Sequence, residues 1–288
     1  MNFARRLRFA AEYAGFRFVG AIFGALPVET ASRLSGLGWR LLAPLSPRHG
    51  RALANLAMAF PDMPTGERQQ IVLGMWDNLG RNFAEFFHLS RIIASDRIVL
   101  EEPERFEALR HAGGCVVCGL HLGNWELSAV GGARAGLRVA GVYQKIANPL
   151  VDAYVTAQRA PLYPAGLMDK SASAARRLLA VGRRGECVAF LADLREGRGV
   201  RSPFFGRAAP STHFPAFIAR NVDIPLFVVR VRRAPGVRFS LRLSPIVVER
   251  TDDRDADVRA ATDAVQAAFE GFIRLYPEQW MWAHRRWD

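Results

Sequence analysis

Apolar residues in the first third of the chain recur at helical spacing. Between residues 65 and 89 they fall on one face of a helix that Thr65 could cap. That face carries Val72, Met75, Trp76, Leu79, Phe83, Phe86 and Phe87. We expect residues 1–92 to be all-helical and to form an N-terminal extension of a second region, residues 93–288.

The pattern changes near residue 113, where short apolar runs begin to alternate with helical stretches. The runs are Cys115–Leu120, Leu137–Tyr143, Cys187–Ala192, Ile224–Val231 and Phe239–Val248. The helical stretches lie near 149–159, 170–182, 211–221 and 254–275. Strands separated by helices predict one compact α/β unit with a largely parallel mixed sheet flanked by helices. Sites in such folds form at the carboxyl ends of strands.

Composition narrows the class of protein. Half of the 288 residues are hydrophobic and 23% are charged, which excludes a disordered chain. Three cysteines in a chain of this length exclude a disulfide scaffold and fit a reducing compartment.

The charge is strongly basic, with 39 Lys and Arg residues against 27 acids and a net charge of +12. Only Lys145 and Lys170 are lysines, so the other 37 basic residues are arginines. An arginine-rich genome would explain this bias. The alternative is an anionic partner, because guanidinium groups bind phosphate and carboxylate in a bidentate manner: nucleic acid, a lipid head-group surface or an acidic carrier protein.

The N-terminal segment has the character of an interfacial membrane helix. Arg5, Arg6 and Arg8 precede an apolar segment, Phe9–Val28, whose longest uncharged part, Phe18–Val28, is too short to cross a bilayer. We expect the arginines to lie among head groups and the phenylalanines to enter the acyl region. Those phenylalanines are Phe9, Phe16, Phe18 and Phe23. A buried first helix is the alternative.

A histidine and a glutamate follow the first apolar run, in the segment His121–Glu126. Across a strand-to-helix turn the two side chains can converge, with Glu126 accepting a hydrogen bond from one imidazole nitrogen of His121. Such a pair could deprotonate a hydroxyl group that belongs to a substrate. A purely structural His–Glu hydrogen bond would look the same in the sequence.

Other chemistry has less support. Cys115 and Cys118 have the spacing of a zinc motif, but strand alternation would place them on opposite faces, and Cys187 stands alone in another run. The chain has neither a G-x-S-x-G elbow nor a P-loop. We therefore expect no metal, no nucleotide and no serine nucleophile.

Two later segments are candidates for the rim of a site. Asp193–Gly199 follows the third run, and Pro203–Thr212 contains a Phe-Phe-Gly turn; a solvated loop with salt bridges is the alternative. The aromatic, basic tail Pro277–Trp287 could stack on bases, pack on the body or lie at a membrane interface.

Together these motifs resemble the lipid A late acyltransferases of Gram-negative bacteria, the lauroyl/myristoyl transferase group of the lysophospholipid acyltransferase superfamily. The resemblance covers nearly the whole chain. It is carried by Trp76, Asn78, Gly80, Arg81, Glu85, His121–Glu126, Asn148–Leu150, Asp193, Pro203–Thr212 and Pro277–Trp287.

The resemblance implies a glycerolipid acyltransferase-like fold and a role in lipid A and lipopolysaccharide biosynthesis. It implies an enzyme on the cytoplasmic face of the inner membrane that moves an acyl chain from acyl carrier protein to a hydroxyl of a lipid A precursor. No cofactor and no acyl-enzyme are expected, and no nucleic acid partner. His121 would be the general base and Glu126 its partner. The substrate-binding residues would be Asn124, Arg159, Asp193, Arg195 and Gly197.

Two departures from the family pattern affect the acceptor. Gln144-Lys145 stands where the family commonly has Arg-Pro, and Leu194-Arg195 replaces the end of the usual Asp-x-Asp. An acceptor other than the usual precursor, such as another phospholipid, glycolipid or aminolipid, therefore stays open. Two further alternatives are an acyl hydrolase or covalent acyl enzyme using Ser211 or a cysteine, and a non-enzymatic nucleic-acid or membrane-binding protein.

Overall fold

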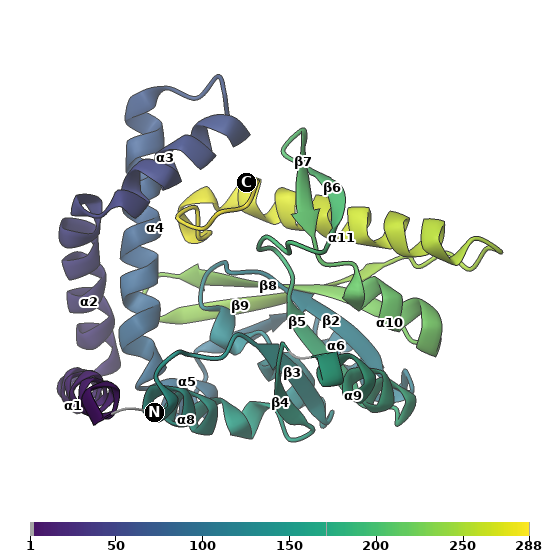
Figure 1. The fold of residues 1–288 in the computed structure, drawn as a ribbon, viewed down its shortest axis with the longest axis horizontal. Helices are drawn as coiled ribbons and strands as arrows, with labels where there is room; N and C mark the ends of the chain where they lie inside the picture. Colours follow the sequence, from purple (N-terminus) through teal and green to yellow (C-terminus); the bar gives the residue numbers. More distant parts are fainter. Residues whose placement is uncertain (1–2, 171, 288) are drawn as a thin grey trace.

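A seven-stranded sheet lies at the centre of the molecule in a computed structural model that describes residues 3–170 and 172–287 (Figure 1). Its strand order is β1-β9-β8-β2-β5-β3-β4. The strands are β1 (Ile98–Glu101), β2 (Cys115–Gly119), β3 (Val139–Tyr143), β4 (Gly166–Asp169), β5 (Cys187–Leu191), β8 (Leu226–Ala234) and β9 (Arg238–Ile246). Neighbouring strands are parallel except β8 and β9, which are antiparallel. The predicted α/β class with a largely parallel mixed sheet is confirmed.

Each predicted apolar run contains a strand, but four strands were not predicted. β1 and β4 are the two edge strands, and with four residues each they are too short to show a pattern. The other two, β6 (Val200–Phe204) and β7 (Arg207–Ser211), form a separate antiparallel hairpin.

Helices surround the sheet and make up the N-terminal part of the chain. The longer ones are α1 (Phe3–Ala25), α2 (Val28–Leu42), α3 (Pro47–Ala59), α4 (Thr65–Phe86), α8 (Pro149–Arg159), α9 (Ala172–Arg183), α10 (Phe214–Val222) and α11 (Arg254–Leu275). The shorter ones are α5 (Leu89–Ile93), α6 (Pro103–Ala108) and α7 (Val130–Arg134), with 3-10 turns such as η3 (Trp125–Leu127) and η5 (Pro277–Gln279).

The predicted helices match these elements closely, with one error at the start of α4. Pro64, not Thr65, occupies the N-cap position, and no side chain caps the helix. The extended backbone of Pro64 places Thr65 inside the first turn, where its hydroxyl cannot reach forward to an exposed N–H.

The run that forms β2 is apolar throughout because both faces of the sheet are buried. Val116 and Cys118 belong to a core shared with α3, α4, α9, α10 and α11, whereas Cys115 and Val117 face a second core with α5, α6 and α7. Burial of each such valine contributes about 1.5–3 kcal/mol. The alternation also confirms that Cys115 and Cys118 point to opposite faces.

The N-terminal helices pack closely on one another and on the sheet core. α2 and α4 lie side by side (Figure 1). A Cβ at Gly80 would lie 2.5 Å from the Ser35 carbonyl oxygen, so only glycine allows this approach. Leu56 of α3 and Met75 of α4 share the core of the sheet. A boundary between two units near residue 92 stays a prediction.

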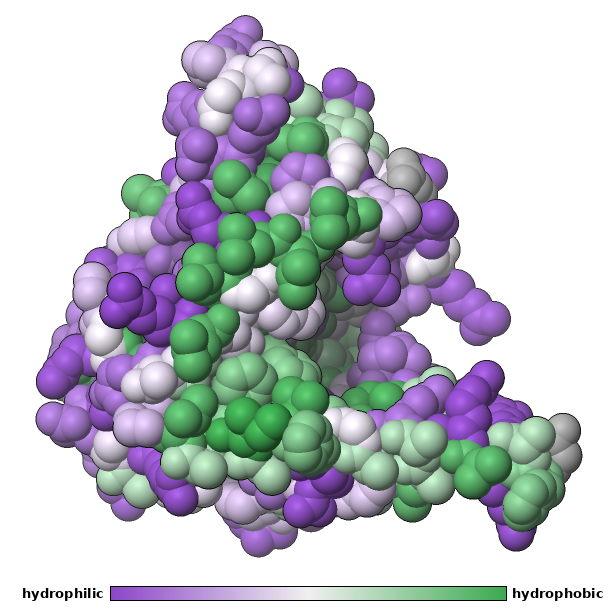
Figure 2. All heavy atoms as spheres, turned by 90° about the vertical axis from the view of Figure 1, so that its left-hand side faces the viewer, coloured by the Kyte–Doolittle hydropathy of each residue, from purple (hydrophilic) through white to green (hydrophobic). Residues whose placement is uncertain are grey.

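The outer side of α1 and α2 is unusually apolar. Eleven of the fifteen exposed large hydrophobic side chains of the described chain lie between residues 3 and 45. We call them the α1–α2 patch: Phe3, Leu7, Phe18, Val19, Ile22, Leu34, Leu37, Trp39, Leu41, Leu42 and Leu45. Figure 2 shows hydrophobic residues gathered on this side of the molecule, beside a hollow. Within the described residues, no helix combines the length and hydrophobicity that a membrane span requires.

The patch differs from the expected set of phenylalanines. Phe18 is exposed, but Phe9 is buried. Phe23 packs against Phe83 of α4, and Phe16 packs against Phe87 at the end of that helix. α1 therefore uses one face to dock on the body and the opposite face to expose its apolar side chains.

Candidate active site

His121 and Asp193 meet at the carboxyl ends of two neighbouring strands. β2 and β5 are parallel and in register, with Gly119 beside Leu191, so the residues two positions further along emerge at the same edge of the sheet. The Nδ1 atom of His121 lies 2.8 Å from Oδ1 of Asp193. The His121 backbone N–H donates to Oδ2 of the same carboxylate at 2.9 Å.

Asp193 is fully buried and stays ionised. Burial alone would raise the pKa of its carboxyl group, but His121 and the hydrogen bonds outweigh burial and hold the pKa below its ordinary value. One of these bonds comes from the indole Nε1 of Trp280 at 2.7 Å. Since the carboxylate accepts from Nδ1, Nε2 of His121 carries the lone pair that can take up a proton.

Glu126 does not bind His121, so the expected pairing of these two residues was wrong. Its carboxylate instead accepts from Nε and Nη2 of Arg159, at 2.7 and 2.5 Å. Asn124 caps the 3-10 turn η3 by accepting from the Glu126 N–H, and the turn directs Glu126 toward α8. Burial disfavours the charge of Arg159, but Glu126 outweighs this and raises the arginine's pKa. The two residues form a partly buried bidentate ion pair.

The position of Arg159 depends on the Asn-Pro-Leu motif at the other end of α8. Asn148 caps that helix by accepting from the Leu150 N–H at 3.0 Å, and Pro149 occupies its first position. The Asn148 amide also donates to the Phe9 carbonyl and to Glu12, both at 2.9 Å. The motif thereby ties α1 to the helix that carries Arg159.

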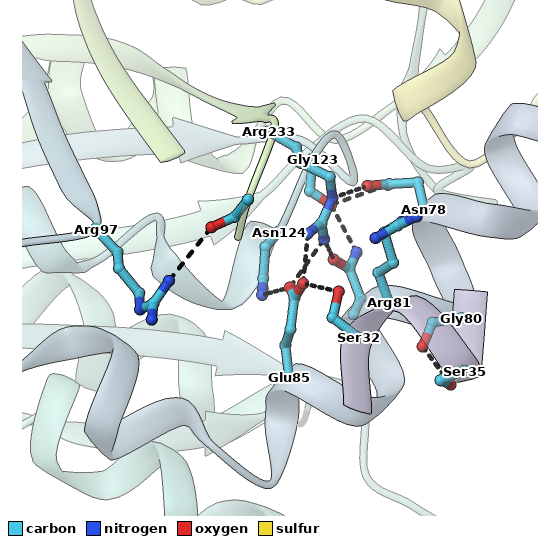
Figure 3. A network of polar contacts seen from close by, with 12 residues as sticks. Ser32, Ser35, Asn78, Gly80, Arg81, Glu85, Arg97, Gly123, Asn124 and Arg233 are labelled. Atoms are coloured by element: carbon cyan, nitrogen blue, oxygen red, sulfur yellow. Dashed lines mark hydrogen bonds and ion pairs between the residues drawn. The ribbon is translucent and has the colours of Figure 1, made fainter. Parts of the chain in front are cut away.

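A buried polar network holds the loop after His121 (Figure 3). The Gly123 carbonyl accepts from the amides of Asn78 and Asn82, at 3.0 and 2.6 Å. The Asn124 amide donates to Glu85 at 2.8 Å. Gly123 has a φ of 61°, and a Cβ there would lie 2.1 Å from the Val231 carbonyl oxygen, so glycine is required.

The same network is centred on the ion pair between Glu85 and Arg233 (Figure 3). Both oxygens of Glu85 accept from the guanidinium, and Ser32 adds a hydrogen bond at 2.7 Å. Burial would raise the pKa of Glu85, but Arg233 and the hydrogen bonds lower it overall. Asn78 and Glu85, two of the motif residues of α4, therefore support the loop and lie outside the reacting centre, whereas Trp76 lines the first cavity described below.

The C-terminal tail packs on the body, which excludes base stacking or membrane contact by its buried tryptophans. Trp280 and Trp282 are almost completely buried. The Gln279 carbonyl accepts from the Gly123 N–H at 3.1 Å, and the Met281 N–H donates to the His121 carbonyl at 3.2 Å. Of the three alternatives expected for the tail, packing on the body is confirmed, whereas its contacts with His121 and Gly123 were not predicted.

The Phe-Phe-Gly turn is also an anchor and not a rim or a solvated loop. Phe205, at a φ of 52°, is buried, and its ring packs against Phe60 and Trp282. Ser211, at the end of the hairpin, is buried as well and accepts from Arg286 at 2.8 Å. It has no histidine partner among the described residues.

Two cavities meet at the Glu126–Arg159 pair. The first, of about 580 Å³, lies between α4, α8 and the tail. The second, of about 280 Å³, is lined by His121 and by the ends of β2, β3 and β5. Both are lined by Trp125, Glu126, Ile146 and Arg159.

The remaining predicted site residues lie outside these cavities. Arg195 and Gly197 are exposed and line neither, and Glu196 pairs with Lys170, not with Arg195. Asn124 belongs to the loop after β2, and its side chain is buried. The structure thus brings His121, Glu126, Arg159 and Asp193 together. Among the described residues, no cluster of three or more His, Cys, Asp or Glu side chains is placed to hold a metal ion.

The fold and the site together define an α/β enzyme in which a carboxylate orients a histidine that lines a cavity. The chain belongs to the bacterial lipid A biosynthesis acyltransferase family, whose profile matches residues 1–288. It is 29% identical over 274 residues to the lipid A biosynthesis lauroyltransferase of Escherichia coli K12, covering 91% of this chain and 86% of that protein. The protein is therefore an acyltransferase of lipid A biosynthesis, and the family resemblance inferred from the motifs is confirmed.

Proposed function

We propose that the protein transfers a fatty acyl chain from acyl carrier protein to a hydroxyl group of a lipid A precursor. The observation that carries the proposal is the His121–Asp193 hydrogen bond beside the junction of two cavities. A histidine oriented in this way can serve as a general base for a hydroxyl that belongs to the acceptor.

The reaction needs two proton transfers, both through His121, and no enzyme-borne nucleophile. Nε2 of His121 takes the proton of the acceptor hydroxyl as its oxygen attacks the thioester carbonyl carbon. The tetrahedral intermediate then expels the thiolate, which receives the proton from the imidazolium. Asp193 keeps the proton on Nδ1 throughout and stabilises the imidazolium, so it acts as a positioning residue.

Arg159 is suited to stabilise the negative charge on the thioester oxygen. Its Nε and Nη2 atoms bind Glu126, which leaves the Nη1 donor unengaged among the described residues, at the junction of the cavities. Glu126 fixes the guanidinium plane in place before substrate arrives. Donors held in position in this way are effective because they need no reorganisation during the reaction.

The cavity beside His121 suits the donor acyl chain. Its floor contains Val117, Ala189 and Gly141, which lie in register across β2, β5 and β3 and offer little side-chain volume. A small cavity of about 20 Å³, lined by Phe106 and Leu109, lies next to this floor and shares Val117 and Ala189 with it. The larger cavity on the other side of Arg159 is then left for the acceptor.

The apolar and basic parts of the surface fit an acceptor lipid in a membrane and an acidic donor protein. The α1–α2 patch can enter the acyl layer of a membrane. In this proposal the lipid A precursor lies in the cytoplasmic leaflet of the same membrane. The net charge of +12 favours encounter with an acidic carrier protein and with anionic head groups.

The test is acyl transfer by purified variants, with lauroyl-acyl carrier protein as donor and a tetraacyl lipid A precursor as acceptor. We expect His121→Ala to lower turnover by roughly 10²–10⁴, because the base is lost. Asp193→Asn should also reduce turnover, since it disturbs the tautomer of His121. His111→Ala is the matched control, because His111 is exposed and outside the site.

Turnover near the wild-type value in a folded His121→Ala protein would refute the mechanism. Mass spectrometry of host lipids after deletion of the gene identifies the acceptor independently. Loss of one acyl chain from lipid A supports the proposal, whereas loss from another phospholipid, glycolipid or aminolipid replaces the acceptor.

A further inference from the structure

Three arginines line the larger cavity away from the reacting centre. Arg48 and Arg51 lie on one face of α3, and Arg285 lies in the tail. We call them the arginine rim. Among the described residues lining this cavity, Glu126 is the sole carboxylate, and it is already bound to Arg159.

The arginine rim has few partners of its own. Within the described residues, the guanidinium groups of Arg48 and Arg285 have neither a hydrogen bond nor an ion pair. Arg51 donates only to the Ala283 carbonyl, at 3.4 Å. By contrast, many other arginines of this chain pair with a carboxylate, as Arg138, Arg220 and Arg274 do. The arginine content of the chain alone does not explain an unpaired cluster around a cavity.

Local electrostatics make the cluster unfavourable unless an anion is bound. Positive charges three positions apart on a helix repel each other. Arg48 lies in the first turn of α3, which has no acidic residue, and the helix dipole disfavours a cation there. His284, beside Arg285, has its pKa lowered by burial, with smaller contributions from His121 and Arg51, and so adds no stable positive charge.

The rim also lies next to an apolar groove. Another cavity, of about 630 Å³, lies between α1, α2 and α4 and shares four lining residues with the first cavity of about 580 Å³: Trp39, Arg48, Trp76 and Phe83. That groove is lined by apolar residues of the α1–α2 patch, including Leu34 and Leu42. A cation at the border of an apolar groove is the arrangement that an anionic lipid requires.

We propose that the arginine rim of Arg48, Arg51 and Arg285 binds a phosphate group of a substrate. The inference rests on the proposed function and specifies how that site recognises its ligand. Two substrates could supply the group: the phosphorylated head group of the acceptor, or the phosphopantetheine arm of the donor. Guanidinium groups suit both through bidentate, charge-assisted hydrogen bonds.

The test uses Arg48→Gln/Arg285→Gln, because these two side chains have no polar partner among the residues that the structure describes. The matched control is Arg176→Gln/Arg177→Gln, which removes two exposed charges from α9. Binding is measured without donor, on phosphatidylcholine vesicles that contain either a diphosphorylated tetraacyl lipid A precursor or the same lipid after phosphatase treatment.

If the acceptor supplies the phosphate, the rim variant should lose at least about tenfold in affinity for the phosphorylated vesicles and nothing for the dephosphorylated ones. If the donor supplies it, vesicle binding stays unchanged. The KM for acyl carrier protein then rises, and this effect disappears with an acyl-pantetheine donor that lacks the phosphate.

The inference would be overturned if the rim variant lost the same affinity for both kinds of vesicle. It would also be overturned if neither the affinity for phosphorylated vesicles nor the KM for acyl carrier protein changed. The binding measurement needs no turnover. If the wild-type protein binds phosphorylated vesicles through the rim but transfers no acyl chain, the proposed function is refuted. The phosphate-binding role of the rim is then still supported.

Discussion

His121 is held by atoms from two distant parts of the chain. Asp193, which follows β5, binds Nδ1, and Met281 of the tail binds the carbonyl group. Trp280 in turn fixes Asp193 through its indole N–H. The orientation of one imidazole therefore depends on contacts that span more than half of the sequence.

The Glu126–Arg159 pair should act as one unit if Arg159 stabilises the developing charge. We expect Arg159→Ala to lower kcat by about 10²–10³, the usual loss on removing such a donor. Glu126→Ala should lower kcat as well, because the guanidinium loses its fixed orientation. The double variant should then be scarcely worse than Arg159→Ala, which a double-mutant cycle on kcat measures.

The control for this cycle is Arg138→Ala/Glu186→Ala, a more exposed ion pair away from the cavities. That double variant should keep its kcat. If the fold-losses in kcat of the two single variants at positions 126 and 159 multiplied in the double variant, the shared role would be contradicted.

The strand-end rule identified His121 and Asp193 from the sequence, but it did not identify them as partners. Spacing along the chain favours Glu126 as the partner, because it is five positions from His121, whereas Asp193 is 72 positions away. Their contact follows from the placement of β5 beside β2, and no local pattern encodes the order of parallel strands. For the same reason the contact between Trp280 and Asp193 could not be predicted.

At the level of elements, the first two helices combine docking with exposure. α1 is tied to α8 through Asn148, and α2 packs on α4 through Ser35 and Gly80. The outer faces of both helices carry the α1–α2 patch. Apolar spacing predicted the helices correctly, but it could not tell which phenylalanines face the body, because nearly the whole surface of α1 is apolar or basic.

The α1–α2 patch should carry the binding to membranes. We expect Leu37→Glu/Leu41→Glu to reduce partitioning onto vesicles of phosphatidylglycerol and phosphatidylethanolamine by at least about tenfold, because two leucines no longer enter the apolar layer. The measurement is vesicle flotation, together with the melting temperature. Both side chains are exposed, at 49% and 65%, so the fold should not change.

The matched control is Val247→Glu/Leu275→Glu, since these residues are equally apolar and exposed at 73% and 64% but lie outside the patch. Equal flotation of the two double variants would place the membrane-binding surface elsewhere. Point substitutions are preferable to removal of residues 1–28, because that deletion would also break the contacts of Phe9 with α8.

At the scale of the whole molecule, Glu85 and Arg233 connect the N-terminal helices to the sheet and the active-site loop. Glu85 comes from α4, Arg233 from the end of β8, and Asn124 from the loop after β2. Glu85 is fully buried, and its carboxylate compensates the charge of Arg233 only while it is ionised. The network should therefore make both global stability and loop geometry sensitive to acid.

The sign of this effect follows from the direction of the pKa shift. The pKa of Glu85 lies below its ordinary value of 4.5 in the folded protein and near that value in the unfolded chain. Between those two values the unfolded chain binds more protons. The contribution of Glu85 is thus complete above about pH 4.5 and is lost as the pH falls through the folded pKa, with a slope of up to about 1.4 kcal/mol per pH unit.

Glu85→Gln should lower the free energy of unfolding at pH 7 by about 3–5 kcal/mol, because Arg233 is left buried without its counter-ion. The same variant should lose less additional stability than the wild type between pH 4.5 and pH 3, since it lacks the titrating carboxyl group. Urea unfolding at a series of pH values measures both quantities. Glu107→Gln, which removes an exposed partner of Arg110, is the control and should follow the wild-type curve. A Glu85→Gln protein with wild-type stability at pH 7 and an unaltered acid slope would show that this network does not hold the three parts of the molecule together.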